Sequence, residues 1–111
     1  LDLEYPQEKI LKIQSKFISE SEQQNFDTND LKAITTLWSA KEAMYKLAGR
    51  NKITFCSELL LSPSSKNTLE GTIINHDHQL KVNLDIFEFE QTIITINSKP
   101  VERIESYSQK N

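Results

Sequence analysis

The pattern of apolar and polar positions divides the chain into a helical first half and a strand-rich second half. The first five residues alternate apolar and acidic side chains, which is typical of a strand with one buried face. Ser19 and Glu22 have the spacing of a capping box, which predicts the start of a short helix. Residues 27–30 supply a turn and then an N-cap, with Asp30 the last of them, for the longest helix. Apolar residues recur at helical spacing along that helix up to Gly49, which we expect to be a left-handed C-cap. The elements predicted for this half are a strand at 1–5 and helices at 7–16, about 20–26 and about 31–48.

After Gly49 the apolar runs become shorter and alternate with polar residues. A polar stretch at 62–67 predicts a loop, and strands are expected from Leu69 onward, with a polar turn at 76–78. The adjacent apolar residues Ile86 and Phe87 interrupt the alternation, so we expect a bulge or turn there. Alternation resumes at residues 92–97. The predicted outline is a strand, several helices and an antiparallel meander, which is an α+β fold.

The length of 111 residues suits one compact domain, expected at residues 1–100 with a polar tail at 101–111. The net charge of −3 argues against binding to duplex DNA, which requires a basic surface, and no nucleic-acid partner is expected. No apolar run approaches the roughly 20 residues that a membrane-spanning helix needs. The single cysteine, Cys56, excludes an internal disulfide. We therefore expect a cytoplasmic protein in a reducing compartment.

Candidate chemistry gathers on the long predicted helix. Lys41 lies within its apolar arc, an unusual place for an ammonium group. Either its stem extends out of the core to solvent, or the ammonium faces a pocket that holds an anion. Glu42 lies at the edge of the arc with Lys46 one turn further on. These two residues form either part of a site or an ordinary i,i+4 pair on a solvated helix face.

A second group of charges lies on the first strand, where Asp2 and Glu4 project from one face roughly 6 to 7 Å apart. Mg²⁺ prefers hard oxygen ligands and often takes a few carboxylates together with water and substrate phosphate. If this strand meets the long helix, the carboxylates of Asp2, Glu4 and Glu42 together with the two lysines would suit a Mg²⁺–phosphate site. The alternative is an acidic pair on a solvated strand edge.

Three segments together resemble the 4′-phosphopantetheinyl transferases. The sequence WSAKEAMYK at 38–46 is similar to that family's W-[ST]-x-K-E-[AS]-x-x-K signature. The sequence LDLE at 1–4 resembles the end of its G-[IV]-D-[IL]-E motif, and KFISESE at 16–22 resembles R-F-[FL]-[ST]-x-x-E. The three motifs occur in the family's order within the first 46 residues.

This resemblance implies an enzyme that moves 4′-phosphopantetheine from coenzyme A to a serine of an acyl or peptidyl carrier protein and releases 3′,5′-ADP. It implies Asp2, Glu4 and Glu42 as Mg²⁺ ligands, with Glu42 also as the general base. Lys46 would neutralise charge on the phosphate under attack, and Lys41 would bind the coenzyme A pyrophosphate. Phosphoryl transfer depends mainly on positioning and charge stabilisation, which this set of residues can supply.

The resemblance also has a subtype. Single-lobed members of the family end in a Ser-Ile-Ser-His-like motif, whereas residues 94–99 here contain no histidine. The closing meander looks more like the second lobe of the two-lobed, surfactin-synthetase-activating type. We therefore expect a C-terminal lobe whose partner is either a missing N-terminal lobe or a second copy. The alternative is a non-catalytic lobe or interaction domain that retains the transferase fold.

Overall fold

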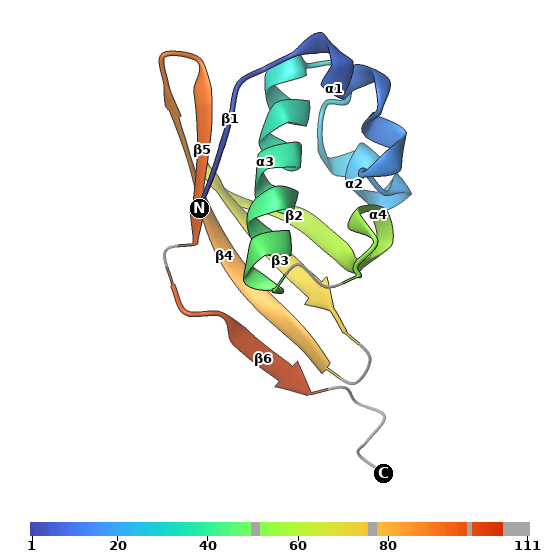
Figure 1. Cartoon of the computed structure of the whole chain (residues 1–111), viewed down its shortest axis with the longest axis vertical. Coiled ribbons are helices and arrows are strands. Elements are labelled where there is room, and N and C mark those ends of the chain that lie inside the picture. The colour runs from blue at the N-terminus through green and yellow to red at the C-terminus, as the bar shows by residue number, and fades with distance from the viewer. Residues whose placement is uncertain (50–51, 76–77, 98, 106–111) are drawn as a thin grey trace.

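In the computed structural model, helices cover one face of an antiparallel β-sheet (Figure 1). The structure describes residues 1–49, 52–75, 78–97 and 99–105. The strands follow the order β1-β5-β4-β3-β2, and β6 pairs with the first part of β4. The α+β fold expected from the sequence is confirmed. The elements are β1 (Asp2–Glu4), α1 (Glu8–Lys12), a 3₁₀ turn (Gln14–Lys16), α2 (Glu20–Asn25), α3 (Leu31–Leu47), α4 (Phe55–Glu58), β2 (Leu59–Ser65), β3 (Thr68–Ile74), β4 (His78–Phe89), β5 (Thr92–Asn97) and β6 (Glu102–Glu105).

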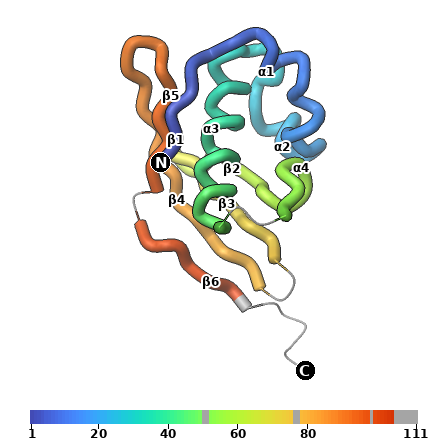
Figure 2. The backbone as a smooth tube through the Cα atoms, in the orientation of Figure 1, coloured from blue at the N-terminus to red at the C-terminus, as the bar shows by residue number. Residues whose placement is uncertain are grey.

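The first strand of the chain, β1, lies at the edge of the sheet (Figure 2). Its pairing partner there is β5, which is distant from it in the sequence. Asp2 pairs with Thr95, and Glu4 pairs with Ile93. Thr95 and Ile93 are buried on the helix-covered face. Because paired residues in a sheet project to the same side, Asp2 and Glu4 face α3.

The long helix α3 lies across the sheet, and its ends agree with the sequence analysis. The Asp30 side chain accepts a hydrogen bond from the backbone N–H of Lys32 at 3.2 Å, which caps the N-terminus. Gly49 follows the helix with φ 83°, a left-handed conformation that favours glycine. Met44 is buried against β3, where a Cβ at position 71 would overlap its sulfur. Gly71 therefore lets the helix approach the sheet closely.

The short helix α2 begins with the predicted capping box. Ser19 Oγ accepts from the backbone N–H of Glu22, and the Glu22 carboxylate accepts from the backbone N–H of Ser19. The expected helix at 7–16 forms as α1 followed by the 3₁₀ turn. The prediction of four elements in the first half is therefore confirmed, with small changes at their ends.

The predicted loop at 62–67 is wrong, because β2 continues to Ser65 and only Lys66 and Asn67 form the turn. Asn67 has φ 63°, which asparagine tolerates better than most residues. Pro63 is accommodated because β2 is an edge strand, where a missing N–H donor need not interrupt the ladder. The register does shift between Pro63 and Ser65, so the irregularity of this sheet lies here.

The bulge or turn expected near Ile86 and Phe87 is also wrong, since β4 runs through both residues in unbroken register with β5. Ile86 packs on the helix side, whereas Phe87 is 52% exposed on the opposite face. Two adjacent apolar residues occur because both faces of the sheet are apolar at this point. The turn itself comes at Glu90 and Gln91, whose φ values of 49° and 73° match a two-residue hairpin.

The predicted polar tail is partly a strand. Residues 102–105 form β6 and pair with the start of β4, with Glu102 opposite Lys81. Residues 106–111 lie outside the described part of the chain. The polar turn predicted at 76–78 also falls partly outside it, since 76–77 are not described and His78 begins β4. The polar composition of this end did not reveal its pairing, because β6 forms at a sheet margin that needs few buried side chains.

Candidate functional site

The two charged groups predicted from the sequence meet where β1 passes the C-terminal half of α3. Lys46 Nζ lies 3.1 Å from Asp2 Oδ1 and 3.3 Å from the carbonyl oxygen of Leu1, to both of which it donates. The Asp2 side chain is 5% exposed, whereas that of Lys46 is 37% exposed. The ammonium group therefore lies at the mouth of the site and the carboxylate at its floor.

The second oxygen of Asp2 lacks a hydrogen-bond partner within the described part of the chain. Asp2 Oδ2 is fully buried and, while Glu4 is ionised, no donor among the described residues reaches it. A buried charged oxygen without a partner is costly, and native proteins seldom keep one without a reason. This oxygen is suited to coordinate a cation.

Glu4 follows Asp2 on the same strand face, and its surroundings disfavour its charge. The pKa of Glu4 is raised from 4.5 to about 7, chiefly by burial. The negative charge of Asp2, a hydrogen bond that protonated Glu4 can make to Asp2, and the charge of Glu42 contribute to this rise, whereas Lys46 opposes it. The three carboxylates therefore form one electrostatic group with more negative charge than Lys46 offsets.

Glu42 is half-buried on α3, one turn before Lys46, and its charge acts on Glu4 across the gap between helix and strand. Among the described residues, no three His, Cys, Asp or Glu side chains lie close enough to hold a metal ion together. The arrangement is thus an Asp2–Glu4 pair with Glu42 nearby. Such a pair fits Mg²⁺, which commonly takes one or two protein carboxylates and completes its shell with water and phosphate oxygens.

Lys41 does not join this group, and both arrangements expected for it are wrong. The side chain is fully buried, so it neither reaches solvent nor faces an open pocket. Lys41 Nζ lies 2.7 Å from Glu22 Oε1 and donates to the carbonyl oxygen of Phe55 at 2.9 Å. Burial lowers the pKa of Lys41, although the hydrogen bond and charge of Glu22 act in the opposite direction. The anion beside this lysine belongs to the chain itself.

Glu22 is the residue whose structural importance the sequence analysis did not anticipate. Its Oε1 accepts from Lys41 and from the backbone N–H of Ser19, and its Oε2 accepts from the backbone N–H of Leu61 at 2.6 Å. The capping box accounted for one of these contacts. The other two join α2 to α3 and β2 over 19 and 39 residues, for which the local sequence offers no signal.

Trp38 lies in an aromatic cluster one turn before Glu42. Its ring centroid is 5.0 Å from that of Phe17 and 5.7 Å from that of Phe55. With Ile13 and Lys16, these rings line an apolar hollow of about 290 Å³. The cluster holds α3 against the 3₁₀ turn and α4.

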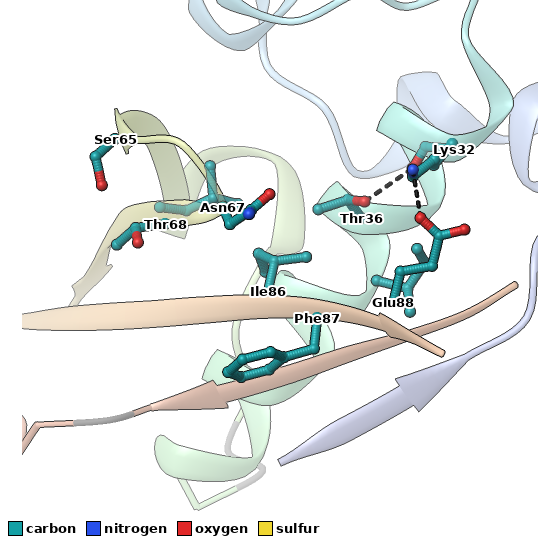
Figure 3. A pocket seen from close by; sticks show the side chains of 10 residues that line it. Lys32, Thr36, Ser65, Asn67, Thr68, Ile86, Phe87 and Glu88 are labelled. Atoms are coloured by element: carbon teal, nitrogen blue, oxygen red, sulfur yellow. Dashed lines mark hydrogen bonds and ion pairs between the residues drawn. The ribbon is translucent and has the colours of Figure 1, made fainter. Parts of the chain in front are cut away.

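A separate hollow of about 240 Å³ lies at the other end of α3 (Figure 3). It is lined by Lys32, Thr36, Ser65, Asn67, Thr68, Leu69, Ile86, Phe87, Glu88 and Ile93. The only lysine of this lining forms an ion pair with Glu88, so its charge is already neutralised. It lies 14 residues before Lys46, about 21 Å along the helix axis, and therefore takes no part in the carboxylate site.

Comparison with known proteins identifies the family. Residues 1–97 match the model of the 4′-phosphopantetheinyl transferase superfamily, a range that contains every candidate site residue discussed above. Comparison with curated proteins and with solved structures finds no significant match. Among the described residues, no helix is both long and apolar enough to cross a membrane. The chain belongs to the 4′-phosphopantetheinyl transferase superfamily, which supports phosphopantetheine transfer as its activity at the family level.

Proposed function

We propose that the chain carries the metal and base residues of a Mg²⁺-dependent 4′-phosphopantetheinyl transferase of the cytoplasm. Its substrates are coenzyme A and an acyl or peptidyl carrier protein, and its second product is 3′,5′-ADP. The carrier's serine oxygen forms a bond to the pyrophosphate phosphorus that bears pantetheine. The bond from that phosphorus to the ADP oxygen breaks, and the serine proton passes to a base of the enzyme.

Asp2 and Glu4 are the proposed direct ligands of Mg²⁺, and Glu42, the third ligand that the resemblance implies, would bind the ion through a water molecule. When bound, the ion would offset charge on the coenzyme A pyrophosphate and orient it. The buried and unpartnered Oδ2 of Asp2 is the observation that supports this proposal most strongly. Glu4 and Glu42 add negative charge at the same place, which a divalent cation would neutralise.

The two charged residues of α3 have distinct proposed roles. Glu42, half-buried and one turn before Lys46, accepts the serine proton directly or through one water. Lys46 keeps an ammonium group at the mouth of the site, from which it can turn from Asp2 to a phosphate oxygen. Lys41 is proposed to support the site through its ion pair with Glu22, in place of the pyrophosphate contact implied by the resemblance.

The test is calorimetric titration of coenzyme A into the chain, first with Mg²⁺ and then with EDTA. We expect binding that requires Mg²⁺ and that is weakened about tenfold or more in Glu42→Gln and Asp2→Asn. Glu70→Gln is the matched control, since it removes the same charge from the far half of the opposite sheet face. Mg²⁺-independent binding, or equal binding by Asp2→Asn, would contradict the proposed metal site.

A second candidate function is a non-catalytic lobe or interaction domain, and one observation favours it. The sheet face opposite the helices carries an exposed apolar patch, which we define as Leu1, Leu3, Tyr5, Phe87, Phe89 and Ile96. Leu3 pairs with Ile94 and Ile94 pairs with Phe87, so the patch runs across three strands. Contiguous exposed apolar surfaces of this kind often mark protein interfaces.

This apolar patch is also the surface we propose for the lobe–lobe contact, whether its partner is an N-terminal lobe or a second copy. Light scattering coupled to size exclusion tests the second copy directly. Self-association that is abolished by Phe87→Ser and kept in Thr72→Ser would support it. A monomer at all concentrations, able to bind coenzyme A with Mg²⁺, would contradict the need for a partner. A chain that self-associates and binds no coenzyme A would favour the non-catalytic function.

A further inference from the structure

The charged residues of the site lie on two elements that are far apart in the sequence. Asp2 on β1 and Lys46 on α3 are separated by 44 residues. The strand β1 has three residues, and its partner in the sheet is β5. The distance between the carboxylates of β1 and the charges of α3 therefore depends on how α3 is held against β5.

A buried hydrogen bond joins these two elements next to the site. Ser39 Oγ on α3 lies 2.8 Å from Thr95 Oγ1 on β5, and both side chains are fully buried. Thr95 is the direct pairing partner of Asp2. Ser39 precedes Lys46 by seven residues, two helical turns, so the two side chains project from nearly the same face of α3.

Two contacts thus fix this helix face against the β1–β5 edge, and they differ in character. The Lys46–Asp2 contact is ionic and lies at the mouth of the site, where bound phosphate and metal would compete for both groups. The Ser39–Thr95 contact joins two neutral hydroxyl groups excluded from water, so it contains no group that titrates or that would compete for a bound ion. It can hold the helix in place while Lys46 and Asp2 exchange partners.

We propose that Ser39 and Thr95 are positioning residues, whose hydrogen bond sets the spacing between the β1 carboxylates and the charges of α3. This inference rests on the proposed function, because it assigns the pair a purpose in holding the metal–phosphate site open to its ligands. Neither residue touches the reacting groups. A purely structural bond would contribute to folding without any effect on the Lys46–Asp2 geometry.

The first test is a double-mutant cycle between Ser39→Ala and Lys46→Met, followed by urea unfolding. Ser39 and Lys46 lie about 10 Å apart along the helix, where independent substitutions are normally additive. If the buried bond sets the geometry of the ion pair, we expect a coupling of about threefold or more in the unfolding equilibrium constant. If Ser39→Ala fails to fold, Thr95→Val with Lys46→Met measures the same coupling from the other side of the bond. Additivity would overturn the proposal, whatever the chain binds.

The second test is the affinity for coenzyme A in Mg²⁺. Thr95→Val, which removes the hydroxyl with little change of shape, should weaken it about tenfold, and Thr95→Ser, which keeps the hydroxyl, should stay within about twofold of the wild type. Equal affinity of Thr95→Val and the wild type would overturn the positioning role. If the wild type binds no coenzyme A, the proposed function of the isolated chain fails. The stability cycle then still decides whether the buried bond sets the Lys46–Asp2 contact.

Discussion

Two lysines of α3 each form an ion pair with a carboxylate from another element, and the two pairs differ in what they leave unsatisfied. Lys41 and Glu22 are both fully buried, and each oxygen of Glu22 accepts at least one hydrogen bond. Lys46 and Asp2, five residues further along, leave Asp2 Oδ2 without a donor and Lys46 partly exposed. The first pair is complete without any ligand. In the second pair, Asp2 Oδ2 is a buried acceptor that remains available to a ligand.

This difference separates a structural pair from a candidate binding pair. A buried ion pair stabilises a protein only when all its polar groups are satisfied, as those of Glu22 are. A buried oxygen left without a partner costs free energy unless something else binds it. Each pair joins a lysine to a carboxylate, so what distinguishes the two is their exposure to water and the number of acceptors left without a donor.

The largest loss of stability is expected at the Lys41–Glu22 pair. Glu22→Gln leaves the ammonium of Lys41 buried without its counter-charge, which typically costs about 3 to 5 kcal/mol of unfolding free energy. Urea unfolding followed by the fluorescence of Trp38, the one tryptophan of the chain, measures this cost. The double variant Glu22→Gln with Lys41→Met removes both charges and should be more stable than Glu22→Gln alone. A loss below about 1 kcal/mol in the single variant would contradict a structural role for the pair.

At the Lys46–Asp2 pair, a substitution should affect ligand binding more than stability. Asp2→Asn removes the charge that would hold Mg²⁺, so affinity for coenzyme A in Mg²⁺ should fall about tenfold or more. The stability cost should be smaller than for Glu22→Gln, because Lys46 remains open to water and repulsion with Glu4 is relieved. Calorimetry and urea unfolding on the same samples compare the two effects. A greater loss of stability in Asp2→Asn than in Glu22→Gln would reverse the comparison.

The pH dependence of stability tests the electrostatics of the Lys46–Asp2 site through its neighbour Glu4. Since its pKa is raised from 4.5 to about 7 in the folded chain, the native state binds this proton more tightly than the unfolded state does. Stability should therefore fall as pH rises from 4.5 to about 7, and saturating Mg²⁺ should oppose this fall by favouring the ionised carboxyl. Thermal unfolding across this range, with and without Mg²⁺, measures both effects. The contribution should vanish in Glu4→Gln, and an unchanged slope in that variant would exclude Glu4 as its source.

The smallest effect is expected at a third pair, on the opposite face of the sheet. Lys81 Nζ lies 3.2 Å from Glu70 Oε2, and both side chains are substantially exposed. Because water screens such a pair, Glu70→Gln should change the unfolding free energy by less than about 1 kcal/mol and leave coenzyme A affinity unchanged. Urea unfolding and calorimetry check this result. A larger loss of stability would mean that exposure is not what separates the three pairs.

Local sequence patterns predicted most of the elements because their causes are local. The capping box at Ser19, the N-cap at Asp30 and the C-cap at Gly49 each act within one helical turn, and all three form as expected. The polar loop expected at 62–67 failed because an edge strand tolerates Pro63, and edge position is a property of the whole sheet. The bulge expected at Ile86 and Phe87 failed because the opposite sheet face is also apolar there.

The sequence by itself determined the residue types of the site, their order along the chain and their place on one strand and one helix. Only the tertiary structure decided which charges meet. The pairing of β1 with β5 brings Asp2 and Glu4 close to Lys46. Lys41 instead forms a buried ion pair with Glu22, away from the site. The physical reason is that the ionic partners and the pKa of a charged side chain are set by the groups that surround it in three dimensions. Periodicity predicts which face of an element a side chain occupies, whereas its partners, solvent exposure and pKa depend on elements that are distant in the sequence.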